Sequence, residues 1–217
     1  IPETQLISQS ISTSDLKCLS EEFSSAFHTQ AIDYDHRESR QRIFTTKDDC
    51  ENYIYQSIID RLFPESAFII DKILFETKTP GHIYTGTLRF WHIDNLKDQF
   101  KLFIPLKNID DQGSMVFYPG THHYKNLPSE LKDKWKQMLD LVLDNTSVLN
   151  NFSDMQIDAL TMQNVKPSLA RTKLGDAFLF NSRIIHSGTE CRYKNRESIT
   201  IYLDHDSVRN QVLDTLR

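Results

Sequence analysis

The sequence predicts a mainly β domain with flanking α-helices. Amphipathic helical patterns occupy the N-terminal part, and segments rich in branched and aromatic residues follow them, some alternating apolar with polar positions. A chain of 217 residues fits one domain with a sizeable core. We therefore expect a single domain over residues 1–217, with helices at about 1–66, a core at about 67–206, and an inserted helix and loop at about 125–170.

Three stripes of apolar residues have the spacing of one helix face. Pro64 ends the second stripe, and Pro128 lies just before the third, where a helix can start. We expect the first two helices to pack outside a sheet and the third to interrupt the strands. The stripes are Leu16, Leu19, Phe23 and Phe27; Cys50, Ile54, Ile58 and Leu62; and Leu131, Trp135, Met138, Leu139 and Val142.

Extended segments account for most of the remaining apolar residues. Turns are indicated at residues 79–81 and at Gly175–Asp176. Residues 144–165 are rich in Asn, Asp and Ser, and we expect a long loop there, either a lid over the functional site or a surface excursion. The expected strands are 67–70, 72–75, 88–93, 100–104, 178–180, 184–186 and 196–203.

Three side chains with metal-binding groups lie at the ends of these strands. His92 and Asp94 are two residues apart, so on a strand both leave the same face, with Cα atoms roughly 6 to 7 Å apart. His186 follows the second extended run. Two imidazoles and one carboxylate on one side of a metal leave the opposite positions open, as in non-haem Fe(II) oxygenases. The sequence therefore predicts His92, Asp94 and His186 as the metal ligands and catalytic centre of an oxygenase.

The last expected strand carries a candidate cosubstrate site. Arg196, Ser198 and Thr200 alternate on one face of it. A guanidinium binds a carboxylate bidentately, and a hydroxyl two residues later donates a further hydrogen bond. We predict that Arg196 and Ser198 anchor the tail of a dicarboxylate.

These segments resemble the phytanoyl-CoA dioxygenase-like family of Fe(II)/2-oxoglutarate oxygenases over about residues 68–204. The similar parts are residues 91–94, a glycine-led strand ending in Pro-Gly-Thr-His at 113–122, Gly175-Asp176-Ala177, His186 and Arg196. The resemblance implies a double-stranded β-helix, that is, a jelly-roll or cupin-like core. It also implies Fe(II), 2-oxoglutarate and O2 as metal and cosubstrates, with hydroxylation of an unactivated C–H bond and release of succinate and CO2.

The resemblance assigns the iron to His92, Asp94 and His186 and the distal carboxylate of 2-oxoglutarate to Arg196 and Ser198. Related halogenases lack the carboxylate ligand, so Asp94 favours hydroxylation over halogenation. No motif identifies the residue that binds the C1 end of 2-oxoglutarate, and the candidates are Tyr84, Thr87 and Lys101. For an anionic group on the substrate they are Arg89, Lys101, Arg171 and Arg183.

Two alternative functions remain open. One is a catalytically silent jelly-roll module that binds metal or 2-oxoglutarate without turnover. The other is a cupin-type metalloenzyme that uses no 2-oxoglutarate, which Arg196 and Ser198 argue against.

Composition limits the partners and the compartment. A net charge of -5 and a pI near 5.9 give no electrostatic reason to expect nucleic acid or an anionic membrane, so we expect a small-molecule substrate. Three widely separated cysteines suggest no disulfide framework, and no apolar run has the length of a membrane span. We expect a cytoplasmic protein whose start at Ile1 reflects trimming or processing. No pattern indicates an oligomeric state.

Overall fold

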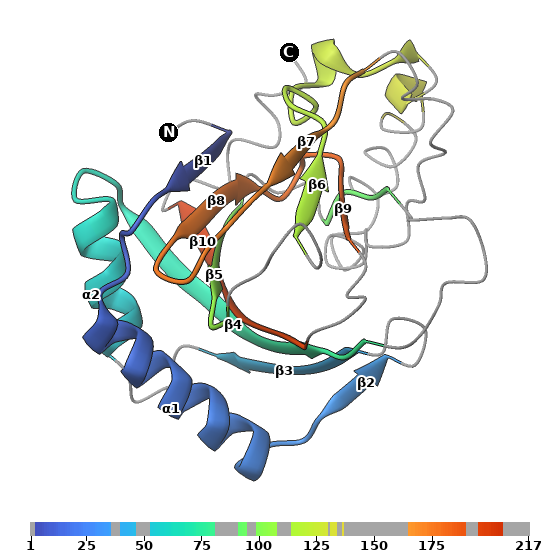
Figure 1. Ribbon diagram of the computed structural model, residues 1–217. Coiled ribbons are helices and arrows are strands. Elements are labelled where there is room, and N and C mark those ends of the chain that lie inside the picture. Colours follow the sequence, from blue (N-terminus) through green and yellow to red (C-terminus); the bar gives the residue numbers. More distant parts are fainter. Residues whose placement is uncertain are drawn as a thin grey trace.

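The computed structural model describes residues 3–35, 40–46, 53–80, 91–94, 99–107, 114–129, 131–133, 136, 165–189 and 195–205. Two antiparallel sheets form its centre. The two helices lie on one side of the larger sheet, and the smaller sheet lies on the other side (Figure 1).

The larger sheet has the strand order β1-β8-β5-β10-β4-β3-β2, and the smaller one has the order β7-β6-β9. The strands are β1 (Thr4–Ile7), β2 (Asp33–Asp35), β3 (Arg40–Thr46), β4 (Phe68–Lys78), β5 (Phe100–Pro105), β6 (Met115–Phe117), β7 (Ser168–Ala170), β8 (Ala177–Asn181), β9 (His186–Gly188) and β10 (Arg196–His205). The helices whose bounds the structure describes are α1 (Thr13–Thr29), α2 (Tyr53–Leu62) and a short 3-10 turn, η1 (Tyr124–Asn126).

Helix α1 begins with a capping box. The Asp15 N–H donates to the Ser12 hydroxyl at 3.1 Å, and the Ser12 N–H donates to the Asp15 carboxylate at 3.3 Å. These bonds satisfy backbone donors that the first helical turn otherwise leaves without acceptors. The first two expected helices are confirmed, and the start expected for the second, at Cys50, lies outside the described residues. Neither helix is long and apolar enough to cross a membrane.

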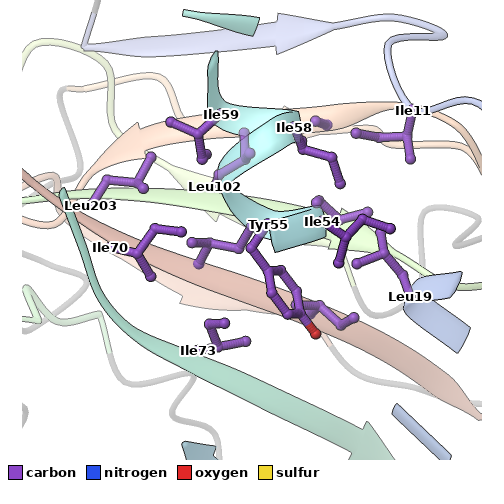
Figure 2. Close-up of a cluster of buried hydrophobic side chains, with 14 of the residues drawn as sticks. Ile11, Leu19, Ile54, Tyr55, Ile58, Ile59, Ile70, Ile73, Leu102 and Leu203 are labelled. Atoms are coloured by element: carbon purple, nitrogen blue, oxygen red, sulfur yellow. The ribbon is translucent and has the colours of Figure 1, made fainter. Parts of the chain in front are cut away.

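Alternation along the strands gives the larger sheet two different faces. The outer face is apolar and packs under α1 and α2, where Leu19, Tyr55 and Ile58 are fully buried against residues such as Ile73 and Leu102 (Figure 2). Burial of one such side chain contributes about 1.5–3 kcal/mol to the free energy of unfolding. This apolar layer fixes which side chains of the same strands must face the smaller sheet.

The inner face is divided between an apolar and a charged half. On β8, Phe178 and Phe180 pack against Phe117, Ala170 and Ile184 in a second buried cluster. Strands β10, β4 and β5 present charged and hydroxyl side chains to the same side, because the cross-strand pairs put them in register. These residues are Glu76, Lys78, Lys101, Arg196, Ser198, Thr200 and Tyr202.

The structure corrects the strand prediction in two places. The strands expected at 67–70 and 72–75 are one strand, β4, whose pairing with β10 shifts between Tyr202 and Leu203. The shift leaves one residue of β4 without a partner on β10. The alternation of inward and outward side chains along β4 therefore changes phase at this point, as it does at a β-bulge. The runs at 178–180 and 184–186 end in different sheets, because a turn at 182–184 carries the chain from β8 to β9.

Several expected segments fall partly or wholly outside the described residues. The strand over 88–93 is described only from residue 91, and the loop at 144–165 only at Val165. Of the third helix, residues 129, 131–133 and 136 are helical, and Leu131 is buried.

Candidate metal centre

A backbone bridge between two distant segments brings the two candidate histidines together. The His92 N–H donates to the His186 carbonyl at 3.0 Å, and the His186 N–H donates to the His92 carbonyl at 2.9 Å. Their ring centroids are 4.4 Å apart. The pairing of residues 94 positions apart in the sequence therefore brings together two of the three candidate ligands.

The carboxylate comes from the residue just beyond this bridge. The Asp94 N–H donates to the Ser182 carbonyl at 3.0 Å, which anchors the chain where it bends. Asp94 Oδ2 lies 3.2 Å from His186 Nε2, and Oδ1 lies 3.7 Å from His92 Nε2. The potential ligand atoms of the three side chains all lie within 4.8 Å of one another. The structure thus brings His92, Asp94 and His186 together as the sequence predicts.

The hydrogen bonding of His186 suits a metal ligand. Its Nδ1 lies 2.9 Å from the Ile184 carbonyl oxygen, which can only accept, so Nδ1 carries the proton. In the neutral ring the lone pair is then on Nε2, which faces Asp94. An imidazole lone pair and a carboxylate oxygen that face each other can both coordinate one cation placed between them. The donor set and its orientation therefore fit a divalent metal such as Fe(II).

A buried lysine neighbours the carboxylate. Lys101 Nζ lies 2.6 Å from Asp94 Oδ2 and 4.4 Å from the centre of the Tyr202 ring. Burial by itself raises the pKa of Asp94, but the Lys101 ammonium and the two imidazoles hold that pKa well below its usual value. Burial lowers the pKa of Lys101, but the Asp94 carboxylate outweighs this and raises that pKa above its usual value. Both groups are therefore charged at neutral pH.

The Pro-Gly-Thr-His segment holds the strand that carries His186. The buried Thr121 hydroxyl accepts the Ile185 N–H at 2.9 Å and donates to the Tyr118 carbonyl at 2.8 Å. The Tyr118 N–H in turn donates to the Ile185 carbonyl at 2.9 Å. These bonds fix the backbone immediately before the third ligand. Sequence reasoning noticed the segment through the family resemblance but did not identify this task of Thr121.

An N-terminal residue that the sequence did not single out supports the same segment. The Glu3 carboxylate accepts the Gly120 N–H at 2.9 Å and pairs with the His122 imidazole. Gly120 has a φ of +82°, a conformation that side chains disfavour. His122 is thus part of a structural contact and lies outside the His92–Asp94–His186 cluster. A lone Glu near a chain start carries no sequence signal for such a role.

The predicted cosubstrate anchors lie on the charged half of the inner face. The Arg196 guanidinium forms an ion pair with Glu76 on β4, and both side chains are largely buried. Ser198, directly opposite Glu76, is 1% exposed, and its hydroxyl has no hydrogen-bond partner among the described residues. The sequence analysis did not single out Glu76. A charged residue within a strand of mostly apolar residues could have indicated a buried ion pair.

The remaining candidates for binding the C1 end of 2-oxoglutarate or an anionic substrate group lie in different parts of the structure. Lys101 is in the site, whereas Tyr84, Thr87 and Arg89 lie outside the described residues. Arg171 is exposed, and Arg183 is buried in the turn between β8 and β9.

Comparison with known proteins supports the fold. The epimerase SnoN from nogalamycin biosynthesis, in complex with Fe3+, alpha ketoglutarate and nogalamycin RO, has a TM-score of 0.63 at 10% identity, over 94% of this chain and 79% of that chain. The carbocyclase SnoK from the same biosynthesis has a TM-score of 0.62 at 11% identity, over 93% and 79%. HygX from Streptomyces hygroscopicus, with nickel, 2-oxoglutarate and hygromycin B, has a TM-score of 0.57 at 13% identity, over 95% and 84%.

These similarities confirm the predicted fold class, a mainly β jelly-roll core of the kind found in 2-oxoglutarate-dependent enzymes. No protein-family model matches the sequence. No curated protein matches it either.

Proposed function

We propose that this chain is an Fe(II)- and 2-oxoglutarate-dependent dioxygenase that hydroxylates an unactivated C–H bond of a small molecule. The observation that carries the proposal is the convergence of His92, Asp94 and His186 within 4.8 Å at the edge of a jelly-roll core. Two imidazoles and a carboxylate on one side of Fe(II) leave positions for a cosubstrate and O2. The related fold of SnoN and HygX, which are described with metal and alpha ketoglutarate or 2-oxoglutarate, supports it.

When bound, Fe(II) with 2-oxoglutarate and O2 would supply an oxidative decarboxylation that releases CO2, in which one oxygen atom of O2 enters succinate and the other is inserted into the C–H bond of the substrate as a hydroxyl. The chain's own residues would bind the metal and the cosubstrate, orient the substrate and exclude water. His92, Asp94 and His186 would hold the metal. The cluster of Phe178 and Phe180 with Phe117 lines the adjacent interior and keeps water out of it.

The charged half of the inner face would hold the cosubstrate. Arg196 and Ser198 are proposed to bind its distal carboxylate. A guanidinium has five N–H donors, more than one carboxylate can accept, so Arg196 can serve both Glu76 and a second carboxylate. Lys101, charged and beside Asp94, is proposed to lie next to the C1 carboxylate.

The phytanoyl-CoA dioxygenase-like family is the proposed relative, from the motifs at residues 91–94 and 113–122. Asp94 supports an oxygen-inserting reaction over halogenation. The epimerase and carbocyclase among the structural neighbours are a second candidate class, because in them the same fold directs a different outcome. Succinate forms in either case, so the fate of the substrate must be measured separately.

The first test is anaerobic addition of Fe(II) and 2-oxoglutarate to the metal-free protein. We expect a weak visible charge-transfer band from the chelate, followed by succinate when O2 is admitted. The Asp94→Ala variant should show neither, because one of three ligands is lost. Tight 2-oxoglutarate binding with no O2 consumption would instead identify a silent binding module. Metal binding without the band would favour a cupin-type enzyme.

A further inference from the structure

A buried ammonium group lies against the carboxylate of the candidate metal centre. Lys101 Nζ is 2.6 Å from Asp94 Oδ2, and the Lys101 side chain is 7% exposed. The same Oδ2 lies 3.2 Å from His186 Nε2. A carboxylate oxygen has two lone pairs, so Oδ2 can accept a hydrogen bond from Lys101 and still coordinate a metal together with His186. A metal bound there would share one ligand atom with a fixed positive charge.

Two aromatic rings confine this ammonium group. Lys101 pairs with Tyr202 across β5–β10 and with Phe180 across β5–β8, so the three side chains lie on the inner face of the larger sheet. Lys101 Nζ is 4.4 Å from the centre of the Tyr202 ring and 6.0 Å from that of the Phe180 ring. Aromatic faces attract cations, and most strongly where water is excluded. The Phe180 ring also meets the His186 ring edge-on, with centroids 5.4 Å apart. The two rings therefore keep the ammonium beside the metal ligands.

The charge of Lys101 opposes the effect of Asp94 on a bound metal. A negative ligand stabilises a trivalent ion more than a divalent ion, because the attraction grows with the charge of the metal. A cation beside that ligand acts in the opposite sense and disfavours the trivalent ion more strongly. Such interactions are larger in a buried environment than in water, and Lys101 is buried.

We propose that Lys101 tunes the redox potential of the metal centre and favours Fe(II) over Fe(III), with Tyr202 and Phe180 positioning its ammonium group. The redox change is the transfer of one electron between the iron and an external donor or acceptor, and no bond to Lys101 forms or breaks. The proposed reaction requires Fe(II), so this charge would help to retain the active form between turnovers. The inference rests on the proposed function and adds a tuning residue to its metal centre.

The test is an anaerobic potentiometric titration of the iron-loaded protein with soluble redox mediators and without 2-oxoglutarate. The Fe(III) fraction is read from its electron paramagnetic resonance signal, so the readout does not depend on turnover. Lys101→Gln removes the charge but keeps a hydrogen-bond donor for Asp94. If the ammonium weakens binding of a divalent ion about tenfold, it weakens that of a trivalent ion about thirtyfold, since repulsion scales with charge. Lys101→Gln should therefore lower the potential by at least about 28 mV, a threefold change at 59 mV per tenfold.

Two further substitutions of Lys101 separate its charge from its packing. Lys101→Arg keeps the charge and should keep the potential of the wild-type protein. Lys101→Met should repeat the lowering expected for Lys101→Gln. Binding of Co(II) shows that each variant retains a folded centre. Loss of Co(II) binding in both uncharged variants would mean that Lys101 is needed to build the centre, which contradicts a tuning role.

Lys72→Met is the matched control. Lys72 lies in the same cross-strand row, opposite Tyr202 on β4, and its Nζ is 4.6 Å from the centre of the Tyr202 ring. Strand β10 separates it from the strand of Lys101, so its loss should change the potential much less. An unchanged or higher potential in Lys101→Gln would overturn the proposal, as would an equal lowering in Lys101→Arg or Lys72→Met. If the wild-type protein binds neither Fe(II) nor Co(II), the proposed function fails as well, which is a distinguishable result.

Discussion

The Thr121 hydroxyl accepts the backbone N–H of Ile185, the residue immediately before His186, at 2.9 Å. The Pro-Gly-Thr-His segment and the third metal-ligand candidate are thus joined by a buried bond between residues 64 positions apart. This bond explains physically why a glycine-led turn with a hydroxyl residue belongs to the site although it supplies no ligand.

Thr121→Val should weaken both folding and metal binding. Valine has the same shape but leaves a buried N–H without an acceptor, which costs about 1–3 kcal/mol. Loosening of the His186 backbone should reduce Co(II) affinity roughly tenfold or more. Urea unfolding and Co(II) titration measure the two effects. Thr29→Val, which removes an exposed hydroxyl in the last turn of α1, is the control and should leave Co(II) affinity unchanged. Normal Co(II) affinity in Thr121→Val would contradict the positioning role.

Lys101→Met should change metal and cosubstrate affinity in opposite directions. A cation 2.6 Å from Asp94 repels an incoming divalent ion, so its removal should strengthen Co(II) binding about tenfold in the absence of cosubstrate. The same change removes an attractive charge from 2-oxoglutarate and should weaken its binding by a similar factor. Lys101→Arg keeps the charge and should resemble wild type. Weaker Co(II) binding in Lys101→Met would instead mean that orientation of Asp94 outweighs repulsion.

Stability should depend on pH through Asp15, which joins the α1 capping box to Arg61 on α2 at 2.7 Å. Burial by itself raises the pKa of Asp15, but the Ser12 hydrogen bonds and the Arg61 guanidinium lower it below its usual value. A lowered folded-state pKa stabilises the fold above the unfolded pKa, near 3.9, and this stabilisation is lost as pH falls through the folded pKa.

Asp15→Asn should therefore lower the free energy of unfolding by about 0.5–1 kcal/mol at pH 7, with the difference from wild type narrowing below about pH 4. Urea unfolding between pH 7 and pH 3 measures this. Glu21→Gln is the control, because Glu21 pairs only weakly with Lys17 on the exposed side of α1. A difference that persists unchanged at pH 3 would exclude the carboxylate as its cause.

The sequence predicted most of the fold and the convergence of His92, Asp94 and His186 because both depend on local patterns. The i, i+2 spacing placed His92 and Asp94 on one side, and apolar periodicity located both helices. The β4 bulge was not predicted, because the local pattern of apolar and polar residues is the same for two short strands and for one kinked strand. Glu76 and Glu3 were not predicted, because their contacts are with residues more than 100 positions away in the sequence.

Arg196 and Glu76 should behave as a coupled pair in stability but not in cosubstrate binding. Arg196→Met alone removes the guanidinium that pairs with the buried Glu76 carboxylate, and breaking a buried pair from one side costs about 3–5 kcal/mol. Glu76→Gln/Arg196→Met removes both charges, and most of that loss in the free energy of unfolding should be recovered. Both variants should still bind Co(II) but should bind 2-oxoglutarate at least about a hundredfold more weakly, since the anchor is absent. Urea unfolding and anaerobic titration separate these effects. Restored 2-oxoglutarate affinity in the double variant would show that Arg196 serves only to neutralise Glu76.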